Sequence, residues 1–119
     1  MMWFRIGSLL LALAIALGAF GAHALRASLP VDAKAIYQTA VLYHLVTGVG
    51  LLAVGLLAAQ RPGDRLIAAS AWALTVGVAL FSGSLYLLSV TGVKKWGMVT
   101  PLGGLGLLAG WLLLAAAVR

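Results

Sequence analysis

The sequence contains no cysteine, no glutamate and no asparagine, and its only carboxylate side chains are Asp32 and Asp64. Without cysteine the chain forms no disulfide and no thiolate zinc site. Without asparagine it has no N-glycosylation site. Only 8% of the 119 residues are charged, whereas soluble proteins average about 25%. These absences exclude an ordinary soluble enzyme and most chemistry that relies on paired carboxylates.

Apolar residues fill the chain instead. They make up 64% of it, and the mean hydropathy is +1.14. The charged side chains leave four uncharged stretches, 6–25, 35–60, 66–93 and 96–118. A hydrocarbon core of about 30 Å needs about 20 helical residues, so each stretch is long enough to cross a bilayer. Because backbone groups in lipid must bond internally and these runs lack the alternation of barrel strands, the stretches predict helices.

The ends of the stretches carry helix-starting signals. Asp32 and Asp64 are expected to cap the second and third helices, and Thr100 the fourth, with Pro101 at its first helical position. We therefore predict one transmembrane domain over residues 1–119, with helices at about 3–25, 33–59, 65–91 and 101–118. Short connections make neighbouring helices antiparallel. The predicted fold class is all-α, an integral membrane four-helix bundle with up-down-up-down topology.

The cations do not reveal the orientation in the membrane. An even number of helices places both termini and the second loop on one side, which carries Arg5, Arg61, Arg65 and Arg119. The opposite side carries Arg26, Lys34, Lys94 and Lys95. With four cations on each side, the positive-inside rule gives no answer. We interpret the net charge of +6 as anchoring to lipid headgroups, not as a nucleic-acid surface. Trp3, Tyr37 and Trp96 lie near span ends, as in an aromatic belt.

Polar residues inside the spans gather in one half of the membrane. Antiparallel threading brings them toward the side of the first and third loops. Because polar side chains in lipid are costly, we expect them to point inward or to line a small hydrated pocket. The candidate pocket residues are His23, Gln38, Thr39, Tyr43, His44, Ser82, Ser84, Tyr86 and Thr100.

Small residues recur at helical spacing and predict close helix packing, which membrane helices achieve without a hydrophobic drive between them. The candidate packing glycines are Gly18, Gly21, Gly48, Gly83, Gly103, Gly104, Gly106 and Gly110. In the third helix, a row of bulky residues predicts a ridge that faces lipid. That row is Ile67, Leu74, Phe81 and Leu88.

Several motifs together resemble a known family. They are GAFGAHAL at 18–25, the pair Tyr43 and His44, LFSGSLYLL at 80–88, TPLGG at 100–104, and Gly110 with Trp111. The chain resembles the YgdD/YwdK-like family of small four-helix membrane proteins, over nearly its whole length. This resemblance implies a bacterial inner-membrane protein, with no established activity and with both termini in the cytoplasm. Members often carry a second histidine three residues after the position of His44, where this chain has Thr47.

The sequence offers few side chains that could act as catalytic acids, bases or nucleophiles, so we expect that the protein is not an enzyme. Asp32 and Asp64 lie on opposite sides of the membrane, and Asp32 is about 18 Å along the helix from His44. A haem or metal bound by His23 and His44 is disfavoured by a depth offset of about 9 Å and by the lack of a third ligand. The simpler interpretation is two neutral histidines that are hydrogen-bonded within the bundle. We expect no metal and no cofactor.

Two functional hypotheses stay open. In the first, the chain is a structural or accessory protein that packs within the bilayer as a homo-oligomer or in a larger membrane complex. In the second, the polar residues form a pocket or passage for a small polar solute, a proton or a lipid headgroup, open to one leaflet. The expected partners are membrane lipids and other membrane helices, and no nucleic acid.

Overall fold

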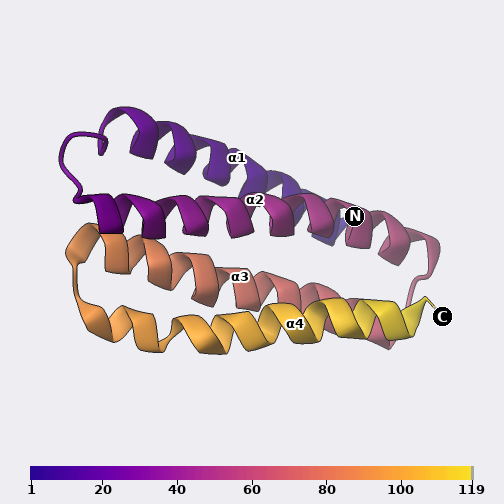
Figure 1. Ribbon diagram of the computed structural model, residues 1–119. Coiled ribbons are helices and arrows are strands. Elements are labelled where there is room, and N and C mark those ends of the chain that lie inside the picture. The colour runs from indigo at the N-terminus through magenta and orange to yellow at the C-terminus, as the bar shows by residue number, and fades with distance from the viewer. Residues whose placement is uncertain (119) are drawn as a thin grey trace.

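The computed structural model describes residues 1–118, which form four long helices and one short 3₁₀ segment (Figure 1). The elements are α1 (Met2–His23), α2 (Val31–Gln60), α3 (Arg65–Thr91), the 3₁₀ segment η1 (Lys94–Met98) and α4 (Thr100–Ala117). Four segments are long and apolar enough to span a membrane, the last one from Lys94 to Ala117. No strand occurs among the described residues, so the prediction of an all-α, up-down-up-down membrane fold is confirmed. Arg119, one of the cations counted on the terminal side, lies outside them.

Helix α3 begins and ends where the sequence predicts. Its N-cap is Asp64, whose Oδ1 accepts hydrogen bonds from the backbone N–H groups of Leu66 and Ile67 at 3.0 and 3.2 Å. The helix ends at Gly92, which adopts a left-handed conformation with a φ of 71°. Glycine takes that conformation without a Cβ penalty, which makes it the usual residue after a helix. Both ends of α3 are therefore set by residues that act on their immediate backbone neighbours.

The other two predicted caps are wrong. Helix α2 begins at Val31 with Pro30 as its N-cap, so Asp32 lies within the first turn and caps nothing. An acidic side chain in that turn still favours the positive end of the helix dipole. Helix α4 begins at Thr100, after Val99, and the Thr100 side chain does not cap it. Its hydroxyl instead meets Ser84 Oγ at 2.6 Å, a contact to another helix.

The four helices lie side by side in chain order, α1 next to α2, α2 next to α3 and α3 next to α4 (Figure 1). No comparable contact joins α1 to α4 within residues 1–118, so the arrangement is open and not a closed ring. About 39% of the apolar stretch of α2 and of α3 is buried inside the protein, against 11% for α1 and 17% for the fourth span. The outer helices therefore present most of their surface to the bilayer.

Apolar packing is concentrated toward the end of the molecule that carries the termini. There the rings of Trp3 on α1 and Trp72 on α3 meet edge to face, with centroids 5.1 Å apart. Ile67 and Leu74 are 1% and 0% exposed, so the predicted lipid-facing ridge on α3 is wrong. The reason is that α3 lies between α2 and α4 and must bury two sides. The buried cluster consists of Trp3, Leu51, Val54, Ile67, Ala71, Leu74, Val78, Leu107 and Ala117.

Glycines let the outer helices approach their neighbours closely. A Cβ on Gly48 would meet Leu11 at 2.9 Å, and one on Gly7 would meet the carbonyl oxygen of Gly48 at 2.9 Å. Between α3 and α4, a Cβ on Gly103 would lie 2.8 Å from the carbonyl oxygen of Gly77. Each hairpin, α1–α2 and α3–α4, is therefore packed backbone against backbone, as small residues permit in membranes.

The predicted packing glycines do not all serve this role. Gly106 and Gly110 face α3, Gly21 faces the Tyr37 ring, and Gly18 faces a Val41 methyl at an ordinary distance of 3.4 Å. Gly104 also has only ordinary contacts, the nearest to Phe81 at 3.7 Å, and a Cβ added to Gly83 would meet nothing within 4 Å. The prediction for Gly83 is therefore wrong, because its side of α3 meets no other helix. Gly7, Gly50 and Gly55 are tightly packed but were not predicted from the sequence, and Gly77 is tightly packed against α4.

Candidate functional site

One face of α2 carries the buried polar residues of this helix. Tyr37, His44 and Thr47 are 5%, 4% and 2% exposed, and Ala40 and Gly48 complete the face. Their spacing of three and four residues places them on one side of a helix. Because α2 lies between α1 and α3, this face meets polar groups from both neighbours.

Three hydrogen bonds link this face to the adjacent helices. The Tyr37 hydroxyl donates to the carbonyl oxygen of Leu17 on α1. From α3, Ser82 Oγ donates to the Ala40 carbonyl oxygen at 2.8 Å. A third bond joins His44 Nδ1 to the Tyr86 hydroxyl at 2.9 Å.

Similar bonds join α3 to α4. Ser84 Oγ and Thr100 Oγ1 are 2.6 Å apart. Ser70 Oγ donates to the Gly110 carbonyl oxygen at 2.7 Å. A hydroxyl group that donates to another helix has its hydrogen-bonding requirement met inside the bilayer. Each such bond adds modest stability, about 0.6 kcal/mol on average. Ser70, Ser82, Ser84, Thr100, Tyr37 and the pair His44 and Tyr86 thus use their polar groups in contacts between helices.

The structure divides the predicted pocket residues into two groups. His44, Ser82 and Ser84 are buried, and Tyr86 and Thr100 are half-buried, so these five lie between helices. The other four, His23, Gln38, Thr39 and Tyr43, are exposed on the outside of the helices. Of these four, Gln38 and Tyr43 line two different surface hollows, whereas His23 and Thr39 line neither, so the nine residues do not share one site. One continuous pocket does not form from them.

Helix geometry explains the outward group. Successive residues of an α-helix are about 100° apart, so Tyr43 cannot share the inward direction of His44. The Tyr43 side chain is 43% exposed and its ring lies 4.6 Å from that of Phe81 on the outer surface. Thr39 satisfies its hydroxyl on its own helix, by donating to the Ala35 carbonyl oxygen at 3.0 Å.

Sequence reasoning missed Tyr37 as a site residue. This tyrosine is buried, and its ring lies 5.2 Å from that of Tyr86, which in turn bonds His44. Its position seven residues before His44 was the available signal, since residues seven apart share a face of a helix. Tyr37 and Trp3 are also buried, so they do not form the lipid-facing aromatic belt that the sequence suggested.

His44 keeps one nitrogen without a partner. Its Nε2 is buried and has no hydrogen bond within the described part of the chain. Among residues 1–118 no group of three or more histidine, aspartate or glutamate side chains is placed to hold a metal ion. Neither described acid lies beside the imidazole: Asp32 is about 18 Å away along α2, and Asp64 pairs with Arg61 at 2.8 Å at the opposite end of the molecule. Tyr86 is thus the hydrogen-bond partner of His44 within residues 1–118.

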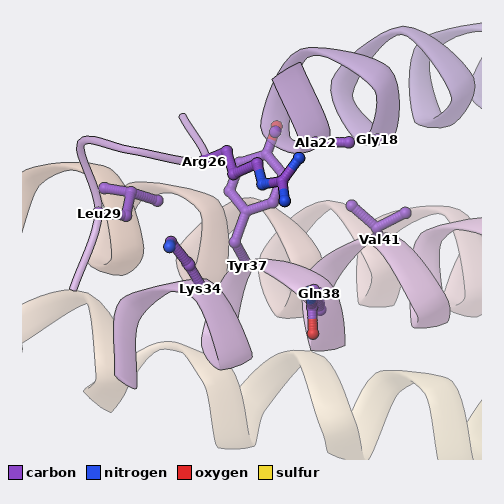
Figure 2. A pocket seen from close by; sticks show the side chains of 9 residues that line it. Gly18, Ala22, Arg26, Leu29, Lys34, Tyr37, Gln38 and Val41 are labelled. Carbon is purple, nitrogen blue, oxygen red and sulfur yellow. The ribbon is translucent and has the colours of Figure 1, made fainter. Parts of the chain in front are cut away.

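The surface formed by residues 1–118 includes two sizeable hollows. The first is a cleft of about 550 Å³ between the end of α1, the following loop and the start of α2 (Figure 2). It is lined by Gly18, Gly21, Ala22, Arg26, Leu29, Lys34, Tyr37, Gln38 and Val41. Of the predicted pocket residues it includes only Gln38.

The second hollow is an apolar groove of about 580 Å³ between α2 and α4, and Phe81 of α3 also lines it. Trp111 lines the groove and packs against Gly50 of α2. A Cβ added to Gly50 would lie 2.8 Å from Cζ2 of the Trp111 indole ring. Thr47 also lines this groove. The lining residues are Tyr43, Val46, Thr47, Phe81, Pro101, Gly104, Leu105, Leu107, Leu108 and Trp111.

Comparison with known proteins gives a consistent result. A family described as "Protein of unknown function (DUF423)" matches residues 17–104. The UPF0382 membrane protein YwdK of Bacillus subtilis (strain 168) is 38% identical over 112 residues, 94% of this chain and 91% of that protein. The UPF0382 inner membrane protein YgdD of Escherichia coli (strain K12) is 39% identical over 106 residues, 88% of this chain and 80% of that protein.

A third relative, the UPF0382 membrane protein SH2409 of Staphylococcus haemolyticus, is 37% identical over 92% of this chain and 88% of its own length. No solved structure matches. The family has no established activity, and its members are membrane proteins. The four apolar spans, their order and these matches together show that this chain is an inner-membrane protein that belongs to the DUF423/UPF0382 family.

Proposed function

We propose that this protein is a non-catalytic accessory component of the bacterial inner membrane, which packs laterally against a second copy of itself through the exposed face of α1. The observation that carries the proposal is the contrast between the two outer helices. Both leave most of their surface uncovered, but only α1 exposes a row of small residues.

The exposed row on α1 consists of Ser8, Ala12, Ala16 and Ala19. These residues recur at steps of four and three and so lie on one side of the helix. Small residues let two helix backbones approach each other in the membrane, where dispersion contacts replace the hydrophobic drive. A second α1 with the same row is the simplest complementary surface, since a two-fold dimer uses one patch twice.

Helix α4 presents a different surface. Its exposed face carries Leu102, Leu105, Leu108 and Leu112, each more than half exposed. Branched apolar side chains suit acyl chains and hold helix axes apart. We therefore assign α1 to the protein contact and α4 to lipid.

The absence of a catalytic role is supported by the use of the polar groups. The inward hydroxyls of Ser70, Ser82 and Tyr86 each bond to another helix, and no described carboxylate lies near His44. Catalysis needs a base within hydrogen-bond reach of a group that it deprotonates, beside a substrate site. The two hollows contain neither His44 nor a carboxylate.

We also propose that both termini face the cytoplasm, which rests on the family resemblance and not on charge. The loops opposite the termini would then face the periplasm. A fluorescent protein fused after Arg119 is expected to be bright, and alkaline phosphatase fused there inactive. Active phosphatase would overturn the orientation without touching the fold.

Disulfide crosslinking tests the lateral contact. Because the sequence contains no cysteine, an introduced cysteine can form a disulfide only with the same residue of a second copy or with another protein. In native membranes, oxidised Ala12→Cys is expected to run as a crosslinked dimer. Ala109→Cys is the matched control, because Ala109 is also an exposed alanine but lies on the leucine face of α4. Absence of the Ala12→Cys dimer, or equal dimer from both variants, would contradict the proposal.

A further inference from the structure

We propose that the cleft between the end of α1 and the start of α2 binds the anionic headgroup of a phospholipid, with the first part of an acyl chain lying along the adjacent helices. The cleft measures about 550 Å³ and opens at the loop end of the bundle (Figure 2). This site is separate from the exposed face of α1 and does not depend on the proposed function.

Two cations line the mouth of the cleft. Arg26 reaches over it from the loop after α1, and Lys34 stands at the start of α2, with Tyr37 between them (Figure 2). No carboxylate lines the cleft, and neither cation forms an ion pair within residues 1–118. An arginine fork and a lysine ammonium are the groups that bind phosphate oxygens in proteins. The neutral side chain of Gln38 adds donors beside them.

The lining of the cleft changes from polar to apolar along its length. Val41 lies seven residues after Lys34, about 10 Å deeper along α2. Gly18 lines the same deeper part from α1. The lining is therefore cationic at the loop and apolar inside the span. An amphiphile with a charged head and a hydrocarbon chain matches that order, whereas a free phosphate uses only the outer part.

Small residues create the space. A Cβ on Gly21 would collide with the Tyr37 ring, at 2.9 Å from its Cδ1. Tyr37 is held in place because its hydroxyl donates to the Leu17 carbonyl oxygen of α1. The ring is thus a fixed part of the lining of the cleft, and the site exists without rearrangement of the helices.

Native mass spectrometry of the purified full chain tests the proposal, with phosphatidylglycerol and phosphatidylcholine as probes in separate micelle preparations. We expect retained phosphatidylglycerol and little phosphatidylcholine. The double variant R26Q/K34Q is expected to weaken phosphatidylglycerol binding about twenty-five-fold, since each cation near an anionic surface contributes about fivefold in affinity.

The control variant K94Q/K95Q removes the same charge from the same membrane face, but outside the cleft. It is expected to retain the lipid as the unmodified protein does. Equal loss in both double variants would show only general surface attraction and would overturn the site. Unchanged binding in R26Q/K34Q would overturn it as well.

Two further measurements separate a lipid from a free anion. Ala22→Leu keeps both cations and fills the apolar part of the cleft, so it is expected to reduce phosphatidylglycerol binding. Excess inorganic phosphate is expected to displace the lipid only weakly. If phosphate displaces the lipid fully and Ala22→Leu binds as before, the cleft takes a free anion and the lipid proposal fails.

Discussion

His44 on α2 and Tyr86 on α3 meet across the central interface of the protein, with Nδ1 and the phenolic oxygen 2.9 Å apart. Their rings are edge to face at 5.9 Å, and Tyr37 packs on the other side of Tyr86. This contact joins α2 to α3, as does the hydrogen bond from Ser82 to the Ala40 carbonyl oxygen. The imidazole of His44, an ionisable group within the membrane span, therefore contributes to the packing of α2 against α3.

Tyr86→Phe is expected to lower the free energy of unfolding by about 1 to 2 kcal/mol, because it removes one hydrogen bond and leaves both imidazole nitrogens of His44 without a partner. Unfolding in mixed micelles measures the change. Tyr43→Phe is the matched control, because Tyr43 points outward and its hydroxyl bonds no described residue. Equal destabilisation by both substitutions would show that the His44 contact has no special weight.

Gly103→Ala is expected to destabilise the protein by about 1 to 3 kcal/mol, the usual cost of overpacking. The added methyl would lie 2.7 Å from Phe81 Cα and 2.8 Å from the Gly77 carbonyl oxygen, so α3 and α4 would have to separate. The same measurement on Gly83→Ala should show no loss and a gain of up to about 1 kcal/mol, because alanine favours the helix and nothing obstructs it. A reversed order would contradict the assigned α3–α4 interface.

Asp64→Ala is expected to cost about 1 kcal/mol, since it removes the side chain that caps α3 through two backbone N–H groups. Asp32→Ala should cost only about 0.3 kcal/mol, because Asp32 acts on α2 solely through the helix dipole. Thermal unfolding in one detergent compares the two directly. Similar losses would mean that Asp32 caps α2 after all.

The spans themselves were predictable because they rest on composition. Charged residues cannot lie within an apolar span without cost, so the gaps between them fix four helices and their order. Helix α3 was also predictable in its bounds, since Asp64 and Gly92 act through their own backbone neighbours. Helix α2 was less predictable, because both Pro30 and Asp32 are acceptable first residues and the sequence gives no means to choose.

Which side of each helix faces inward could not be read from polarity alone. Tyr43 and His44 are both polar and adjacent, yet only His44 is buried. A tyrosine can face outward because its ring is largely apolar, and the Tyr43 ring packs against that of Phe81. Tyr37 is the opposite case, a residue at the end of a span that turns inward to bond Leu17.

The glycines show the same limit. Gly77 and Gly83 lie in the same helix, six residues apart. Gly77 is buried against α4 and Gly83 meets open space, a difference that arises from the packing partner. The cleft that holds Arg26 and Lys34 was likewise beyond sequence reasoning, because it depends on how far α1 stands from α2 near Tyr37.

Polar groups within the membrane form hydrogen bonds between the helices of this protein. A double-mutant cycle on His44 and Tyr86 tests it most directly, with His44→Leu, Tyr86→Phe and the double variant unfolded in the same mixed micelles. We expect a favourable coupling energy between the two side chains of about 0.5 to 1.7 kcal/mol, the range of interhelical hydrogen bonds in membranes. A coupling energy of zero would contradict this role.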